Sequence, residues 1–386
     1  MALLPVQRGS GYPAARAAAL RLHPHLARHL HAASPEEERE LLPDLDVIEE
    51  IIDVAFWASL RREETLTPRI SLAFVAPTSV YMPLVLERPV PLASQALTRL
   101  GPAADRPGIH LCVIRQDGHL VVWGATRNLP QYSFVVEVAA PGLLVVKHSR
   151  GDDSAKFVNI AVLQGDDVKV VDFTPAALDG CPELITSLLG LQSDPESNGS
   201  SDTVSILMQL AGSMRAHGRG GSLLVVPAGV DTWQESILQP VTYAIAPPFR
   251  ALVELMREEQ PERSRRRWQE ALRRAIDGVA GLTAVDGATV ITDQYEVLAF
   301  GAKILRRLGW KQVERVLVGE PTEGAVTLAV EPSHLGGTRH LSAAQFVHDQ
   351  RDAIALVASQ DGRFTVFGWS PAEGMVYGNR IETLLL

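Results

Sequence analysis

Residues 284–302, AVDGATVITDQYEVLAFGA, contain the pattern that decides the fold of the C-terminal part of the chain. The apolar run 288–292 predicts a buried strand, and 297–299 predicts a second one. Downstream, strand and helix patterns alternate: a helix over 301–308, strands near 313–318 and 325–330, a helix over 341–350, and strands over 353–359 and 363–369. This alternation predicts an α/β domain over 246–386, with a mixed sheet flanked by helices.

Two helix patterns open that domain, over 248–259 and 261–277. The second has six arginines between Arg263 and Arg274. Its apolar residues recur at helical spacing and share one face, so we expect a packed amphipathic helix with a solvated basic side rather than a polyanion site. The residues of this face are Trp268, Leu272, Ala275 and Ile276.

Residues 1–245 predict an α+β region. Helix patterns cover 12–33 and 34–62, and an apolar run at 70–75 predicts a strand. Short strand patterns then recur between residues 108 and 173, with Gln116-Asp117-Gly118 as a hairpin turn. These strands, over 109–114, 120–123, 134–138, 143–146, 158–162 and 168–171, predict a mostly antiparallel sheet.

The stretch 192–202, QSDPESNGSSD, predicts an exposed connection, because it lacks apolar residues. Whether the N-terminal region is one domain, or two domains divided near this loop, is left open by the sequence. A helix over 203–217 and a buried strand over 223–226 follow it.

Composition limits the classes of function. A chain of 386 residues predicts two or three domains. Its 36 Lys and Arg residues against 45 Asp and Glu give a net charge of −9, which argues against a nucleic-acid partner. Cys112 and Cys181 form no C-x-x-C pair, which argues against a disulfide framework or a cysteine-rich zinc site. With no long apolar run and no signal-peptide pattern, we expect a cytoplasmic protein without a membrane span.

Four histidines, His23, His25, His29 and His31, are crowded into the first helix pattern. His25 and His29 have the i,i+4 spacing of a helical metal site. No acid or cysteine nearby completes such a site, so a surface helix is the favoured interpretation.

The first motif with chemical potential is Asp286-Gly287-Ala288, at the mouth of the predicted strand 288–292. Glycine allows close approach of a ligand to the backbone, and the carboxylate of Asp286 can bind a hard cation or accept a proton. Taken alone, the same residues are typical of an ordinary turn before a strand.

The second motif is Gly336-Gly337-Thr338-Arg339-His340, directly before the predicted helix 341–350. The glycines let the backbone wrap an anion, Thr338 supplies a hydroxyl, and Arg339 supplies a bidentate cation. His340 is a further donor, and a helix start adds free amides. The pattern predicts a triphosphate site, although a solvated glycine loop would look similar.

Together with 352–359, DAIALVAS, these two motifs resemble the bacterial diadenylate cyclase domain, the nucleotide-binding domain of the DNA-integrity-scanning protein and of membrane-bound cyclases. The resemblance covers about 250–370. Upstream, HGRGGSLLVVP at 217–227 resembles a sensor domain sometimes fused to such cyclases. The resemblance therefore implies a C-terminal cyclase domain over 246–386 and an N-terminal sensor region over 1–245, whose ligand is unknown.

The resemblance implies synthesis of cyclic di-AMP from two ATP molecules, one held by each protomer of a homodimer or higher oligomer. Asp286 would bind Mn²⁺ or Mg²⁺ or activate the 3′-hydroxyl. The catalytic set would be Asp286, Arg339 and His340. Residues implied to bind the nucleotide are Gly287, Ala288, Gly337, Thr338 and Ser359.

The chain departs from the cyclase pattern at three places. Leu341 stands where a second arginine is usual, so one phosphate contact is missing or comes from Lys303, Arg306 or Arg307. Asp286 and Arg339 are 53 residues apart, longer than the family norm. Gln360 follows Ser359 where an acid is frequent. These departures motivate an alternative, a receptor that binds ATP or a cyclic dinucleotide without turnover, and a third, a dimerisation module.

Overall fold

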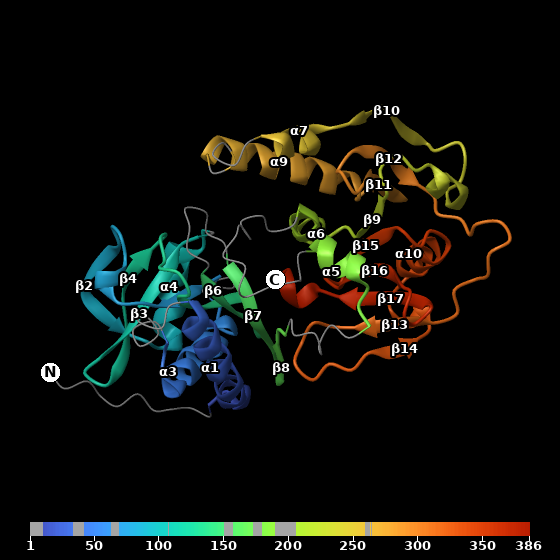
Figure 1. Ribbon diagram of the computed structural model, residues 1–386. Helices are drawn as coiled ribbons and strands as arrows, with labels where there is room; N and C mark the ends of the chain where they lie inside the picture. The colour runs from blue at the N-terminus through green and yellow to red at the C-terminus, as the bar shows by residue number, and fades with distance from the viewer. Residues whose placement is uncertain are drawn as a thin grey trace. The chain divides into compact units, whose positions relative to one another are not determined.

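The computed structural model describes residues 11–33, 42–62, 69–106, 108–149, 157–172, 180–189, 206–258, 263 and 265–386. The chain divides into two compact units, Met1–Val171 with Leu386, and Asp172–Leu385. Each unit is a mixed sheet with helices packed on it, so the chain belongs to the mixed α/β class (Figure 1).

The first unit contains an eight-stranded sheet with the order β2-β4-β3-β1-β5-β6-β7-β8. Strands β1 and β3 are parallel, and every other neighbouring pair is antiparallel. The strands are β1 Ser71–Phe74, β2 Leu84–Pro91, β3 His110–Gln116, β4 His119–Thr126, β5 Phe134–Ala140, β6 Leu143–Ser149, β7 Phe157–Gln164 and β8 Asp167–Val170. The mostly antiparallel sheet predicted from the strand spacing is confirmed.

The turn between β3 and β4 shows why the sequence folds this way locally. Asp117 and Gly118 have φ angles of 50° and 81°, the left-handed pair that a tight two-residue hairpin requires. Glycine adopts this conformation without a Cβ penalty, and aspartate tolerates it better than most residues. The predicted hairpin is therefore confirmed at its turn.

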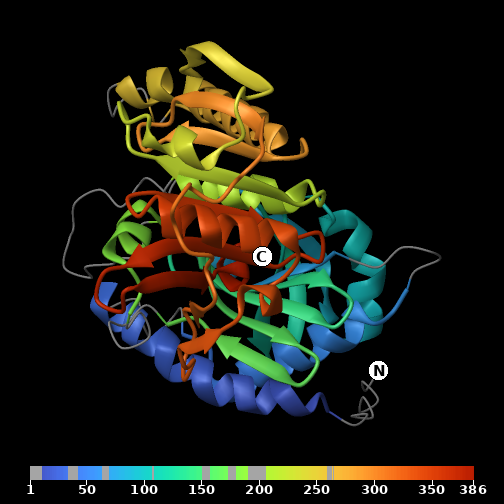
Figure 2. The same ribbon diagram turned by 90° about the vertical axis from the view of Figure 1, so that its right-hand side faces the viewer.

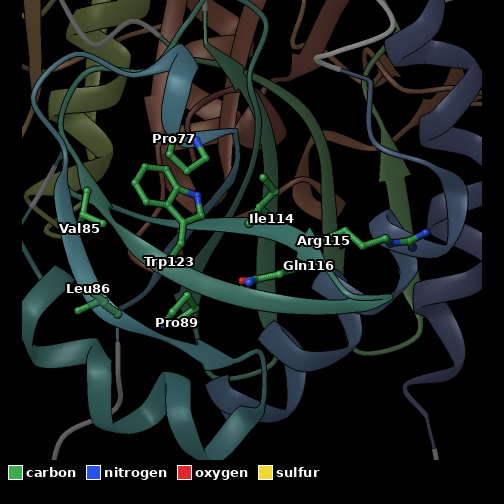
Figure 3. Close-up of a pocket in the computed structure, with 8 residues that line it drawn as sticks. All are labelled: Pro77, Val85, Leu86, Pro89, Ile114, Arg115, Gln116 and Trp123. Atoms are coloured by element: carbon green, nitrogen blue, oxygen red, sulfur yellow. The ribbon is translucent and has the colours of Figure 1, made fainter.

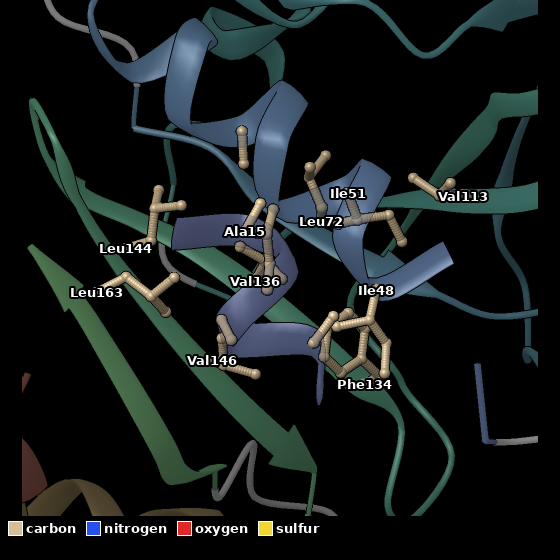
Figure 4. Packing of buried hydrophobic residues seen from close by; sticks show 14 of the residues in the cluster. Ala15, Ile48, Ile51, Leu72, Val113, Phe134, Val136, Leu144, Val146 and Leu163 are labelled. Atoms are coloured by element: carbon tan, nitrogen blue, oxygen red, sulfur yellow. The ribbon is translucent and has the colours of Figure 1, made fainter. Parts of the chain in front are cut away.

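The helices of the first unit build its core. Among the residues that the structure describes, they are α1 Pro13–Ala33, α3 Leu45–Ser59 and α4 Ser94–Ala104. Ile48 and Ile51 of α3 are buried in one cluster with Leu72, Phe134 and Val136 of the sheet (Figure 4). The helix predicted over 34–62 is observed as α3, and its predicted beginning lies outside the described residues.

The second unit contains a nine-stranded sheet with the order β10-β12-β11-β9-β15-β16-β17-β13-β14. Only β9–β11 and β13–β17 are parallel pairs. The strands are β9 Gly221–Val226, β10 Tyr243–Phe249, β11 Ala288–Thr292, β12 Val297–Ala302, β13 Val316–Gly319, β14 Leu328–Val330, β15 Ile354–Ala358, β16 Phe364–Ser370 and β17 Met375–Arg380.

Helices cover both faces of this sheet (Figures 1 and 2). One hydrophobic cluster joins the sheet to α5 Glu183–Leu189, α6 Ile206–Ala216, α7 Ala251–Arg257 and α9 Arg266–Leu282. A second cluster joins the alternate strand residues to α10 Thr338–Asp349. Because side chains alternate across a strand, the two clusters lie on opposite faces. The predicted mixed sheet flanked by helices is thus observed.

The compact units divide at 171/172 rather than at the predicted boundary of 245/246. The physical reason is β9, which pairs with β11 on one side and β15 on the other, in the centre of the second sheet. The predicted connection at 192–202 lies outside the described residues. The functional assignment of the two predicted regions stays a prediction.

The helix predicted over 301–308 is wrong. Gly301 and Ala302 complete β12 instead, and Gly301 has a φ of 63° that no helix accepts. Leu308, at the end of the predicted helix, is 98% exposed. In contrast, α9 continues past its predicted end at 277 to Leu282, and Trp268, Leu272 and Ile276 are buried as predicted.

Among the described helices, none combines the length and the apolar character needed to cross a membrane. Cys112 and Cys181 are both free thiols, as expected from their spacing. Burial raises the pKa of each thiol to about 12, so neither is a reactive thiolate at neutral pH.

We expect Gly221→Ala to destabilise the second unit. A Cβ at Gly221 would lie 2.5 Å from the carbonyl oxygen of Thr283, a backbone atom that cannot move aside cheaply. The expected loss is about 1–3 kcal/mol in the free energy of unfolding, measured by urea denaturation. Gly212→Ala in α6 is the control, because its Cβ meets open space and alanine favours a helix. Equal midpoints for the two variants would contradict this packing.

His110 of β3 makes the stability of the first unit depend on pH. Its Nδ1 shares a 2.8 Å hydrogen bond with the Ser71 hydroxyl, and burial lowers its pKa to about 4, with Glu137 and Lys147 as the charges nearby. Below pH 6.5 the imidazole of His110 is protonated in the unfolded chain, whereas in the folded chain it stays neutral until about pH 4. Stability therefore falls as the pH falls through this window, by roughly 3 kcal/mol.

The measurement is thermal unfolding of the wild type and His110→Gln between pH 7.5 and 4. We expect the variant to be less stable at pH 7.5 and to lose less stability on acidification. Parallel pH profiles for the two proteins would show that the imidazole does not cause the dependence.

Candidate functional site

Four chain segments meet at one edge of the second sheet because of strand register. Strands β9 and β11 are parallel, so both begin there, with Ala288 opposite Ser222. The antiparallel β15 and β12 both end there, with Ala358 opposite Gly221 and Ala302 opposite Ala288. The first motif and Ser359, separated by more than 70 residues, are therefore brought to the same edge.

Asp286 stands just before β11 and is almost fully exposed, with 89% of its side chain accessible. Its carboxylate forms an ion pair with Lys303, the residue that follows β12. The hydrogen bond and charge of Lys303 lower the pKa of Asp286, and the charge of Arg339 lowers it further. Asp286 is thus ionised at neutral pH and open to a ligand.

Gly287 must be glycine at this position. Its φ is 112°, and a Cβ there would lie 2.7 Å from the carbonyl oxygen of Gly301. Gly301 is constrained in turn, because its own Cβ would lie 2.8 Å from the ring of Tyr243. Tyr243 stacks on Phe300 with ring centroids 4.7 Å apart. The first motif therefore rests on an aromatic pair that the sequence analysis did not identify.

The second motif forms the start of α10. Gly337 is the N-cap, Thr338 is the first helical residue, and no side-chain hydrogen bond caps the helix. The guanidinium of Arg339 lies 3.1 Å from the position of a Cβ on Gly220, which is itself 3.2 Å from the carbonyl oxygen of Ala358. Arg339 therefore lies over the ends of β9 and β15, and its charge acts on Asp286.

His340 occupies a different position from Arg339. It is only 2% exposed, with its ring packed edge-on to Phe367 at 6.2 Å. Burial lowers the pKa of His340, so the ring is neutral at pH 7. A Cβ on Gly336 would lie 2.7 Å from Cε1 of this ring and closer still to its Nδ1, so the glycine loop rests directly on it. The ring supports the loop from beneath, and its catalytic role stays a prediction.

Ser359 lies in the tight turn between β15 and β16. Its backbone nitrogen donates to the Arg363 carbonyl at 2.9 Å. The hydrogen bond from its hydroxyl is the main reason that the pKa of Asp361 is lowered. An acid therefore does contact Ser359, but it is Asp361, two residues further along the chain, rather than the residue directly after the serine.

A pocket of about 530 Å³ adjoins the start of α10. Thr338 and Leu341 come from the helix, and the other wall comes from the irregular segment after β12. The lining residues are Ile304, Leu305, Arg306, Gln312, Thr338, Leu341, Ser342 and Gln345. Of the residues predicted to bind the nucleotide, Thr338 thus borders a cavity that can hold part of an organic ligand.

Asp286 suits a divalent ion only as a single protein ligand. The described part of the chain contains no cluster of three or more His, Cys, Asp or Glu side chains that could hold a metal. Mg²⁺ is commonly held by one or two carboxylates together with substrate phosphates. The donor set therefore fits a metal that arrives with a nucleotide, provided that Lys303 releases the carboxylate.

The comparisons with known proteins identify one region of the chain. Residues 37–127 match the family described as "Probable sensor domain DACNV", which is associated with diadenylate cyclases. No curated protein matches the chain. A solved structure, a hypothetical membrane spanning protein from Bacillus cereus, is 13% identical over 50% of this chain and 73% of that chain, with a TM-score of 0.27.

The family match lies inside the predicted sensor region over 1–245, but it does not include the motif that carried the resemblance. Residues 217–227, on which that resemblance was based, form the turn into β9 and the strand itself, inside the second sheet. The family match lies at 37–127, in the first unit. A glycine-rich turn into a strand is common, and here it serves the candidate site instead.

The matched region contains a pocket of its own, of about 320 Å³ (Figure 3). The register of β2 on β4 shifts between Val85 and Val90, so the residues between them arch over Trp123. Arg115 points away from Trp123 and pairs with Asp46 instead. The lining is Pro77, Val85, Leu86, Pro89, Ile114, Arg115, Gln116 and Trp123, which suits a small apolar molecule.

We expect Lys303→Met to raise the pKa of Asp286, because it removes the larger cause of the lowered value. Arg339→Ala should raise it by less, and Lys311→Met is the matched control. The measurement is an NMR pH titration of ¹³C-carboxyl-labelled aspartate, assigned with Asp286→Asn. An unchanged Asp286 titration in Lys303→Met would show that the ion pair does not form in solution.

Proposed function

We propose that the chain synthesises cyclic di-AMP from two ATP molecules and that the region matching the sensor family regulates this activity. The observation that supports the proposal best is the meeting of Asp286, Lys303, Arg339 and the start of α10 beside a pocket. Phosphoryl transfer needs mainly positioning and positive charge, and this edge supplies both.

In the proposed reaction, the 3′-hydroxyl oxygen of each ATP attacks the α-phosphorus of the other. A new P–O bond forms, the bond to the β,γ-pyrophosphate breaks, and the hydroxyl proton is released. Two such transfers close the ring and release two pyrophosphates. Because one site holds one ATP, the reaction requires two protomers whose sites face each other.

The positions of the residues give each a different role in the proposed reaction. The amides at the start of α10 and the guanidinium of Arg339 bind phosphate oxygens. Gly287 and Ala288 allow the nucleotide to approach the backbone closely, and Thr338 adds a hydroxyl. Asp286 holds Mn²⁺ or Mg²⁺ or activates the 3′-hydroxyl, and the metal supplies charge stabilisation at the phosphates.

The sensor match gives independent support, because its family is associated with diadenylate cyclases. Sensor and catalytic regions in one chain are consistent with regulation by an unidentified ligand. The pocket above Trp123 is a candidate place for that ligand.

A nucleotide receptor without turnover is the second candidate. Leu341 removes a cation from the start of α10, and Lys303 already pairs with Asp286. Both features weaken the catalytic site more than the binding pocket. Such a receptor would bind ATP or a cyclic dinucleotide, and the bound nucleotide would change the state of the first unit.

The test is incubation of the purified full chain with ATP and either Mn²⁺ or Mg²⁺, with products identified by mass spectrometry. We expect cyclic di-AMP from the wild type and a loss of at least about 100-fold in Asp286→Asn and Arg339→Ala. Glu270→Gln, on the exposed side of α9, is the control with an unchanged rate.

Each other outcome selects a different function. Tight binding of ATP or cyclic di-AMP without product favours the receptor. Absence of any nucleotide binding, with a stable oligomer, favours a dimerisation module.

A further inference from the structure

The pocket at the start of α10 has a single charged side chain in its lining, that of Arg306. Leu341 belongs to α10 and contributes apolar surface there, where an arginine would contribute charge. Thr338 both lines the pocket and begins the helix, so the N-terminal end of α10 borders this cavity. A polyanionic ligand in this pocket has Arg306 as its charged partner.

The other two candidate cations, Lys303 and Arg307, do not line this pocket. Lys303 pairs with Asp286. Arg307 forms a 2.6 Å ion pair with Glu235, and its side chain lies over the ring of Trp310. Arg306 makes no hydrogen bond or ion pair with the residues that the structure describes, and its side chain is exposed.

The segment that bears Arg306 is held in place from both sides. The backbone nitrogen of Arg307 donates to Asp349 at 2.7 Å. Gln345 of α10 accepts from the Val313 nitrogen at 2.9 Å and donates to the Lys311 carbonyl at 3.1 Å. Arg306 is therefore presented to the pocket by an anchored backbone, which lowers the entropy cost of binding a ligand.

We propose that Arg306 binds a phosphate group of the nucleotide and so supplies, from the segment after β12, the contact that Leu341 cannot make from α10. The inference rests on the proposed function and adds a specificity residue to its site. A guanidinium suits this task because its planar donors match phosphate oxygens in pairs.

The test compares the binding of ATP and of adenosine by calorimetry, in the full chain with Mg²⁺. We expect Arg306→Ala to weaken ATP binding by about 10- to 100-fold and to leave adenosine binding unchanged. Arg306→Lys should recover part of the loss. Arg266→Ala, which removes an exposed arginine of α9 far from this pocket's lining, should match the wild type.

Introducing Leu341→Arg into the Arg306→Ala variant should restore ATP affinity, because both positions line the same pocket. A purely structural effect of losing Arg306 would not be rescued in this way. Wild-type ATP affinity in Arg306→Ala, or an equal loss for adenosine, would overturn the assignment. Failure of the wild type to bind any nucleotide would instead refute the proposed function and this inference with it.

Discussion

Strands β9 and β11 run parallel in the centre of the second sheet, and the candidate site depends on this pairing. Parallel neighbours begin at the same edge, so the approach to each strand is exposed there. The antiparallel β12 and β15 then end at that edge and bring Lys303 and Ser359 to it. Close backbone approach at Gly221 and Gly287 keeps this edge compact, since a side chain at either position would collide with backbone.

Charge at this edge is balanced before a ligand arrives. Asp286 is exposed, yet its pKa is lowered, because Lys303 and Arg339 both favour the ionised form. Exposed ion pairs contribute little to stability, so the pair can open at small cost. Phosphates would attract Lys303 and Arg339, and a divalent ion would attract Asp286. In the proposed function, ligand binding at this edge would therefore exchange ionic partners rather than create new charge.

Sequence patterns predicted the parts of the fold with strong apolar periodicity, such as β11, β15 and α9, and the two motifs of the candidate site. They missed β2 and β10, edge strands whose residues are mostly exposed and which contain proline, so neither apolar alternation nor strand propensity marks them. The division into compact units at 171/172 has no signal in the sequence for a related reason. The partners of β9 lie more than 60 residues away in sequence, and pairing at that separation leaves no local signal.

Arg339 and His340 show how one helical turn separates roles that look alike in sequence. Consecutive helical residues point about 100° apart, so a turn packed on a sheet sends one side chain outward and the next inward. Arg339 faces the sheet edge and Asp286, whereas His340 is buried against Phe367 with its pKa lowered. A phosphate site built here thus takes its charge from arginine and its rigidity from a neutral imidazole. Leu341 lines the pocket and carries no charge. A phosphate in this pocket therefore needs a cation from another segment of the chain.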